Sequence, residues 1–255
     1  MSMSHRKLGA IAGAALLLGA FGAVGHCGLT PLYIQQAVNE PTRPDRDRQR
    51  DADRKPAAVI GFAGIKPGDM VAELMPGGGY FTRIFCRIVG PSGHVYAVSV
   101  GAVVKRERPP APDADKALPN PCTNVTADSK EAADFSLPSG LDVVWTSENY
   151  HDLHNKMFGT PDMKVFDSAI FKALKPGGVF IVEDHAAEAG SGARDTETLH
   201  RIDVELVKQE VTSAGFKFVA ASELLRNPDD PHTAKVFEMA GKSDKFLLKF
   251  RKPKH

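Results

Sequence analysis

The chain has 255 residues, of which 42% are hydrophobic and 25% are charged, and its formal net charge at pH 7 is +1. This length and balance predict one globular domain of ordinary size with an appendage. A net charge so close to zero argues against nucleic acid or an anionic membrane as a partner.

The first 25 residues differ from the rest of the chain. Basic residues at 5–7 precede an uncharged stretch over 8–25 that ends in small residues. This order is typical of a secretory signal peptide, so we predict a signal over 1–25, cleavage before His26 and export to the periplasm. A chain that kept this segment would be anchored in the membrane. After cleavage we expect no stable membrane association, and the sequence leaves the oligomeric state open.

Residues 26–55 have the pattern of a charged linker or N-terminal arm. The stretch "RPDRDRQRDADRK" alternates positive and negative charge and has no apolar face. We expect a solvated arm or an exposed helical turn that leads into a helix near Pro56, since proline suits the first helical position. A lid that folds over a ligand is the alternative interpretation.

The three cysteines, Cys27, Cys86 and Cys122, do not have the spacing of a zinc site. In an oxidising compartment Cys86 and Cys122 could form a disulfide. Two ordinary buried thiols are the slightly favoured interpretation, because cysteine is among the most buried residue types.

From residue 56 to 253, strands and helices are expected to alternate. Apolar runs that end in turn residues predict strands at 69–74, 93–100, 124–128, 141–147, 177–184, 216–222 and 245–252.

Helical spacing of apolar residues predicts helices at 79–90, 162–174 and 195–215. Near-continuous apolar stretches such as 143–145 and 179–182 indicate strands buried on both faces. The pattern predicts the α/β class: a doubly wound, mostly parallel, seven-stranded Rossmann-like sheet with an antiparallel edge.

The stretch "VAELMPGGGYFTRIF" places three adjacent glycines directly after the first strand. In such sheets ligands bind outside the carboxyl ends of the strands. Glycines there permit positive φ and let a ligand approach the backbone, while the following helix offers free N–H groups. A tight strand-to-helix connection is the plainer explanation. A P-loop is excluded, because no Gly-Lys-Ser/Thr follows.

Four motifs, in order and properly spaced, resemble the class I S-adenosylmethionine-dependent methyltransferases. They are "ELMPGGGYFT", "TADSKEAADFSLPSGLDVVW", "ALKPGGVFIVED" and "SAGFKFV", and the resemblance covers residues 56–253. More narrowly, "DRKP", "ELMPGGGY", "NYHDLHN" and "LLKFRKP" resemble an exported bacterial subgroup known mainly as predicted methyltransferases. The resemblance implies a methyltransferase-like domain over 56–253, S-adenosylmethionine as cofactor and a small-molecule acceptor.

The resemblance also assigns the residues that would bind the cofactor. Glu73 would organise the turn and the ammonium group, Asp128 would accept from the adenine amine, and Asn149 with Tyr150 would line the floor near the sulfonium. The full set is Glu73, Pro76, Gly77, Gly78, Gly79, Tyr80, Ser99, Asp128, Asn149 and Tyr150.

Two positions depart from the family pattern. Met75 stands where most members have a glycine, and Ser99 stands where most have an acidic residue that holds the ribose hydroxyls. A hydrogen bond to a charged group is worth about 1.5–3 kcal/mol and one between neutral groups about 1. We therefore expect cofactor binding to be weaker by about tenfold or more, unless Asp128 or another acid compensates.

Candidate catalytic residues follow the fourth and fifth strands. His151 and Asp152 lie in "SENYHDLHN", and Asp184 and His185 lie in "VEDH". Either histidine is suited to act as general base near neutral pH, with an aspartate to orient it. The plainer interpretation is a helix start with solvated histidines.

Further candidates are weaker. In the predicted helix at 195–215, His200 and Asp203 are one turn apart, and a surface pair is the favoured interpretation. Asp152, Asp184, His185 and either His151 or His154 have the right atoms for a divalent ion. Their spacing lacks a zinc signature, so no metal is predicted.

Three functions remain on the sequence alone. The first is a methyltransferase. The second is an exported protein of the same fold that has lost catalysis and binds another ligand, which Met75 and Ser99 favour. The third is an exported enzyme of another class that uses Asp184, His185 and a metal. We favour the first because of the order of its motifs.

Overall fold

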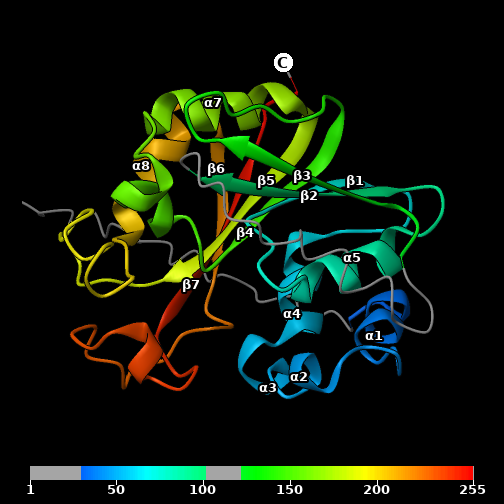
Figure 1. Cartoon of the computed structure of the whole chain (residues 1–255), viewed down its shortest axis with the longest axis horizontal. Helices are drawn as coiled ribbons and strands as arrows, with labels where there is room; N and C mark the ends of the chain where they lie inside the picture. The colour runs from blue at the N-terminus through cyan, green and yellow to red at the C-terminus, as the bar shows by residue number, and fades with distance from the viewer. Residues whose placement is uncertain (1–29, 102–121, 255) are drawn as a thin grey trace, which may run out of the picture.

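Seven strands form a single sheet in the order β3-β2-β1-β4-β5-β7-β6 (Figure 1). The computed structural model describes residues 30–101 and 122–254, so the predicted signal peptide lies outside the described residues. The strands are β1 Met70–Leu74, β2 His94–Gly101, β3 Val125–Glu131, β4 Leu141–Ser147, β5 Leu174–His185, β6 Lys217–Ser222 and β7 Lys245–Arg251. Neighbours from β3 through β5 pair in parallel, and β7 runs antiparallel to both β5 and β6. The predicted fold class is confirmed.

Helices cover both faces of this sheet. The helices are α1 Leu32–Val38, α2 Asp45–Arg48, α3 Asp51–Arg54, α4 Pro56–Ala63, α5 Tyr80–Val89, α7 Met163–Ala173 and α8 Val204–Ser213. In Figure 1, α7 and α8 lie on one side of the sheet and α1, α4 and α5 on the other. Among the described residues, no helix is long and apolar enough to cross a membrane.

Strand β4 shows why the central strands are apolar without interruption. Val144 belongs to the core cluster beneath α7, whereas Val143 and Trp145 belong to the cluster beneath α5. Trp145 is fully buried, and its ring centroid lies 4.9 Å from that of Phe81 and 5.3 Å from that of Phe85. Because successive side chains point to opposite faces, both sets must be apolar when both faces are covered.

The charged segment before Pro56 is folded against the domain and only partly solvated. Its alternating charges are paired across elements: Arg43 donates two hydrogen bonds of 2.8 Å to Asp51, and Arg83 Nε donates to Asp47 Oδ2 at 2.7 Å. Asp47 and Arg54 are both buried. The expectation of a solvated arm is therefore wrong for these side chains, because their partners lie far along the chain where charge periodicity gives no indication of them.

The predicted helix at 195–215 begins later than expected, at Val204. Asp203 caps it by accepting from the Glu205 amide at 2.9 Å, and its other oxygen accepts from the Gly190 amide at 2.8 Å. An N-cap residue is non-helical, so the chain before it forms a loop in which His200 has φ of 56°. This loop carries His200 away from the helix surface where the sequence placed it.

Cys86 of α5 and Cys122 form a disulfide, with their Cα atoms 6.1 Å apart. The slightly favoured expectation of two separate thiols is wrong. The amide of Asn124 explains the approach, since its Nδ2 donates to the Cys86 carbonyl at 3.0 Å and to the Gly90 carbonyl at 2.8 Å. These bonds fix the chain entering β3 against the end of α5.

Removing the disulfide should lower the free energy of unfolding. The bond spans a sequence separation of 36 residues. A disulfide that closes a loop of that size typically raises the free energy of unfolding by about 2–4 kcal/mol. We expect Cys122→Ala to lose that amount in urea unfolding without reductant. Wild-type protein in reductant should match the variant. Equal midpoints for the variant and the oxidised wild type would show that the disulfide does not form in solution.

Candidate active site

The turn between β1 and α5 runs mostly through left-handed backbone. Met75, Gly77 and Gly79 have φ of 49°, 55° and 78°. Glycine adopts this region freely, but a side chain there costs about 1–2 kcal/mol. This is why glycine would suit the position of Met75. The Met75 amide donates to the Val98 carbonyl at 2.8 Å, and Asn149 Nδ2 donates to the Met75 carbonyl at 3.1 Å. These two bonds hold the strained residue in place.

A cavity of about 370 Å³ opens beside this turn. The turn, the ends of β1 and β4, and the helices α2 and α3 form its wall. Six of the residues predicted to bind a cofactor line it: Glu73, Pro76, Gly77, Gly78, Tyr80 and Asn149. The wall also carries charges of both signs, from Arg46, Asp47, Arg50, Arg54 and Glu148. The sequence missed these five residues, because all but Glu148 come from the segment expected to be a linker.

Other predicted cofactor residues do not line this cavity. Ser99 lies on β2 with its side chain exposed, and Asp128 lies on β3, where Lys130 Nζ sits 2.9 Å from its Oδ2. Tyr150 is fully buried, and its hydroxyl donates to Asp167 Oδ2 at 2.9 Å. Gly79 stands at the N-cap of α5. Cofactor roles for these residues stay predictions.

Glu73 is a buried acid at the base of the cavity. Its side chain accepts a short hydrogen bond from the Thr82 hydroxyl. Burial raises the pKa of Glu73 to about 7, against the smaller opposing effects of the Thr82 hydrogen bond and the nearby charge of Arg54. A cationic group placed in the cavity would favour the ionised form of Glu73.

His151, the first residue of the short 3₁₀ helix η1 (His151–His154), is bound to the buried carboxylate of Asp184. Its Nδ1 lies 2.8 Å from Asp184 Oδ1, and its backbone amide donates to Asp184 Oδ2 at 2.7 Å. Burial opposes a charged imidazole, but the carboxylates of Asp184, Asp152 and Glu148 together outweigh it and raise the pKa of His151. The structure thus brings together this histidine and aspartate from the ends of β4 and β5.

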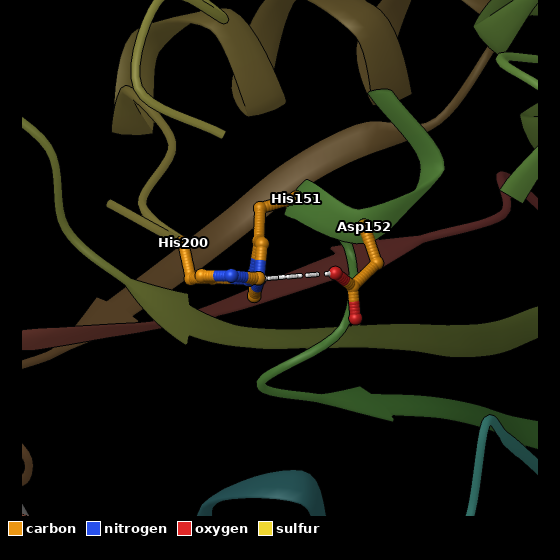
Figure 2. A group of neighbouring side chains, drawn as sticks. All are labelled: His151, Asp152 and His200. Atoms are coloured by element: carbon orange, nitrogen blue, oxygen red, sulfur yellow. Dashed lines mark hydrogen bonds and ion pairs between the residues drawn. The ribbon is translucent and has the colours of Figure 1, made fainter. Parts of the chain in front are cut away.

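The other imidazole nitrogen of His151 faces two further side chains (Figure 2). His151 Nε2 lies 3.3 Å from His200 Nδ1 and 3.3 Å from Asp152 Oδ1. His200 was expected to pair with Asp203 on a helix surface, and that expectation is wrong. The N-cap signal of Asp203, just before the apolar spacing of α8, was the indication that the helix begins after His200.

His185 lies apart from this group, although it follows Asp184 directly. Its Nδ1 is 2.8 Å from the Ser243 hydroxyl, and its backbone amide donates to Asp184 Oδ1 at 2.7 Å. Burial lowers the pKa of His185 to about 4, so the ring is neutral at physiological pH. Of the four predicted catalytic residues, His151, Asp152 and Asp184 form one group, while the side chain of His185 hydrogen-bonds elsewhere.

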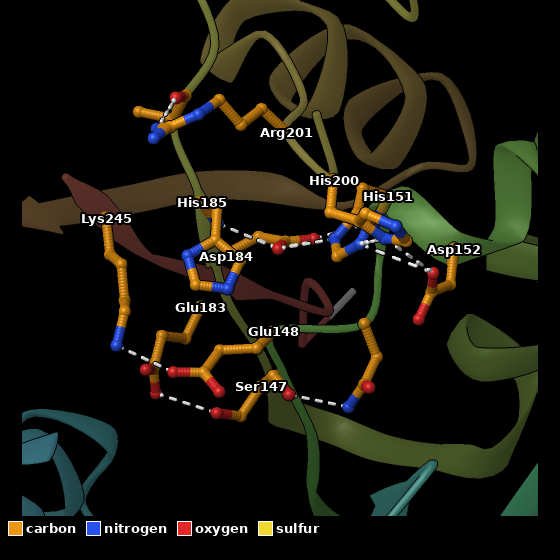
Figure 3. A network of polar contacts seen from close by, with 12 residues as sticks. Ser147, Glu148, His151, Asp152, Glu183, Asp184, His185, His200, Arg201 and Lys245 are labelled. Atoms are coloured by element: carbon orange, nitrogen blue, oxygen red, sulfur yellow. Dashed lines mark hydrogen bonds and ion pairs between the residues drawn. The ribbon is translucent and has the colours of Figure 1, made fainter. Parts of the chain in front are cut away.

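At the cavity wall, Glu148 joins α3 to the sheet, and Figure 3 shows its contact with Lys245 of β7. It binds Arg54 through one carboxylate oxygen and Lys245 through the other, the latter at 2.6 Å. Burial opposes ionisation of Glu148, but these two cations hold its pKa well below the usual range. Burial, with the negative charge of Glu148, raises the pKa of the neighbouring Glu183 to about 7.

Comparison with known proteins agrees with this architecture. No family model matches the chain. A ubiquinone/menaquinone biosynthesis C-methyltransferase (UbiE) of Pseudomonas paraeruginosa is 26% identical over 184 residues, which cover 70% of this chain and 66% of that protein. A protein-L-isoaspartate O-methyltransferase of Ignicoccus hospitalis is 27% identical over 128 residues, 49% of this chain and 52% of that protein. The match thus spans just under two thirds of the length of the first relative and about half of the length of the second.

Solved structures share the fold. A S-adenosylmethionine-dependent methyltransferase from Aquifex aeolicus superposes with a TM-score of 0.59 at 18% identity, covering 84% of this chain and 96% of that one. The [4+2]-cyclase SpnF superposes with a TM-score of 0.57 at 18% identity, covering 80% and 83%. The chain therefore has the fold of the class I S-adenosylmethionine-dependent methyltransferases. The cyclase among its neighbours shows that this fold also carries other functions.

The raised pKa of Glu73 predicts a pH-dependent stability. Its folded-state pKa of about 7 exceeds the ordinary value of 4.5. The folded protein therefore holds an extra proton between these values, and the free energy of unfolding falls as pH rises through this window. Between pH 4.5 and 8 the free energy of unfolding of the wild type should fall by up to about 3 kcal/mol more than that of Glu73→Gln.

Urea unfolding at several pH values measures the effect. Glu183 contributes equally to wild type and variant, so their difference isolates Glu73. Glu197→Gln, at an exposed position, is the matched control and should follow the wild-type profile. Parallel profiles for wild type and Glu73→Gln would contradict a Glu73 that burial keeps from ionising.

Proposed function

We propose that this protein transfers a methyl group from S-adenosylmethionine to a small-molecule acceptor. The observation that carries the proposal is the glycine turn at the carboxyl end of β1, which opens into a charged cavity at the edge of a methyltransferase-type sheet. Ligands of open α/β sheets bind at this edge. Both curated relatives described above are named as methyltransferases.

The cavity fits the cofactor at its amino-acid end. An α-amino acid carries an ammonium and a carboxylate, and the cavity wall offers the acid Glu73 and the arginines Arg50 and Arg54. A β-carbon built on Gly78 would meet no heavy atom within 4 Å, so the backbone there is open to a ligand. Residues of α2 and α3 form part of the cavity wall at this end.

The bound cofactor supplies a methyl group already activated on a sulfonium, so the protein must mainly orient the acceptor and take up its proton. His151 is the residue placed to take up a proton. Its Nδ1 is fixed on Asp184, so Nε2, the nitrogen that faces Asp152 and His200, is the atom that would accept the proton. Asn149 fixes the turn through the Met75 carbonyl and lies two residues before His151 along the chain.

Two further parts of the proposal concern the affinity for the cofactor and the compartment in which the protein works. Ser99 offers the ribose a neutral partner, so we propose a weaker affinity than an acidic residue would give, with Asp128 as the adenine partner. We also propose that the chain is exported and belongs to the exported bacterial subgroup that its motifs resemble. The disulfide between Cys86 and Cys122 supports export, because disulfides persist in oxidising compartments. The alternative of a catalytically inactive binding protein has no support from the relatives.

Calorimetric titration with S-adenosylmethionine and S-adenosylhomocysteine tests the proposal. We expect micromolar binding to the wild type and at least a tenfold loss in Gly78→Ala, because the added methyl group would occupy ligand space. Gly78 has no positive φ and no close neighbour, so the folded state should be unaffected. Gly61→Ala on α4, which also meets nothing within 4 Å, is the matched control and should bind normally.

A second variant, Asp128→Ala, tests the adenine contact separately and should weaken binding without changing stability. Absence of heat from folded wild-type protein at millimolar ligand would overturn the proposed function. Equal affinities for Gly78→Ala and Gly61→Ala would show that the ligand binds elsewhere than the glycine turn.

A further inference from the structure

Three donor atoms from two separate segments converge near the ends of β4 and β5 (Figure 2). They are Nε2 of His151, Oδ1 of Asp152 and Nδ1 of His200. The three separations are 3.3 Å between the imidazole nitrogens, 3.3 Å from His151 Nε2 to Asp152 Oδ1, and 3.8 Å from His200 Nδ1 to the same oxygen. His151 is buried and the other two side chains are partly exposed, so the group has one open side.

Each of these side chains also contacts a further residue that fixes its orientation. Asp184 binds Nδ1 of His151 at 2.8 Å, and Asn155 Nδ2 donates to Asp152 Oδ1 at 3.2 Å. The ring of Phe237 packs against His200 edge-on, with centroids 4.6 Å apart. An imidazole whose second nitrogen binds a carboxylate is the usual arrangement of a metal-bound histidine, because it fixes the tautomer and the ring direction.

Hydrogen bonding satisfies the group only when the ring of His151 carries a proton on both nitrogens. When the ring is neutral and Nδ1 donates to Asp184, Nε2 carries only a lone pair, and it faces the carboxylate of Asp152, which is also an acceptor. A proton from His200 can serve one acceptor of the pair but not both. A single cation between them would be bound by all three atoms at once.

We propose that His151, Asp152 and His200 form a binding site for a divalent metal ion of the zinc class. A tetrahedral ion with ligands at about 2.0–2.1 Å places its ligand atoms about 3.3 Å apart. Two of the three observed separations equal that value, and the third exceeds it by 0.5 Å. Two imidazoles and one carboxylate form a ligand set that zinc and its neighbours favour, and three protein ligands leave a fourth position open.

The ligand set differs from the one that the sequence suggested. Asp184 is fully buried and is used by His151, so it supports a ligand without being one. The ring of His185 hydrogen-bonds the Ser243 hydroxyl instead. His200 takes the place of His185, because the loop before α8 carries it to the end of β4.

The open position suggests what the metal would do, and this step rests on the proposed function. His151 follows Asn149, which lines the cofactor cavity, by two residues. A metal there would bind an acceptor through oxygen and lower the pKa of its hydroxyl. With its Nε2 bound to the metal, His151 would hold the ion and would no longer be the group that takes up the proton of the acceptor. Phe237 is 76% exposed and touches His200, so it offers apolar surface to the same acceptor. The substrate class is therefore an apolar or aromatic compound that carries a hydroxyl group.

Titration of chelator-treated protein with Co²⁺, followed by displacement with Zn²⁺, tests the site without any activity assay. We expect one equivalent of Co²⁺ to bind with the visible absorption of a tetrahedral complex, and Zn²⁺ to abolish it. His200→Ala and Asp152→Asn should each weaken binding at least tenfold. His154→Ala is the matched control, because His154 lies on the same 3₁₀ helix but binds Glu210 at 3.0 Å.

Circular dichroism of each variant shows whether it is folded, and the two ligand-replacing variants change partly exposed side chains, which favours folding. Absence of Co²⁺ binding in folded wild type, or equal binding by wild type and His200→Ala, would overturn the metal site. Binding of S-adenosylmethionine without metal uptake would overturn this inference alone. If the wild type takes up metal and His200→Ala and Asp152→Asn do not, the metal site is supported. That conclusion holds even if the wild type does not bind S-adenosylmethionine.

Discussion

The carboxylate of Glu148 is the contact on which the arrangement of this site depends. It follows β4 directly and binds Arg54 of α3 on one side and Lys245 of β7 on the other. Removing one partner of such a buried pair typically costs about 3–5 kcal/mol, because a charge is left without compensation. Glu148 therefore ties α3, which lines the cavity, to β7 of the sheet.

Parallel strands end at one edge, and this constraint gathers the rest of the chemistry. The glycine turn after β1, Asn149 after β4 and Asp184 at the end of β5 all lie at that edge. The cavity beside the glycine turn and the group formed by His151, Asp152 and His200 are consequently neighbours. A methyl donor and a metal-bound acceptor would need this proximity, since alignment supplies most of what methyl transfer requires.

The fold could be predicted because it depends on local periodicity. Apolar runs located all seven strands, and the glycine turn followed from residues adjacent in sequence. The site could be predicted only in part. Glu73, Gly77, Gly78 and Asn149 were found through motifs, but Arg50 of the covering segment was not, because a charge that is paired across space has no periodic signature along the chain.

By itself the sequence determined the sheet, its antiparallel edge and the strand ends at which ligands bind, because apolar spacing and glycine turns act over a few residues. Only the tertiary structure decided that the charged segment covers the cavity, that Cys86 pairs with Cys122, and that His200 rather than His185 joins His151. Each of these depends on contacts between residues more than thirty positions apart. No local pattern along the chain records which distant partner each of these residues contacts.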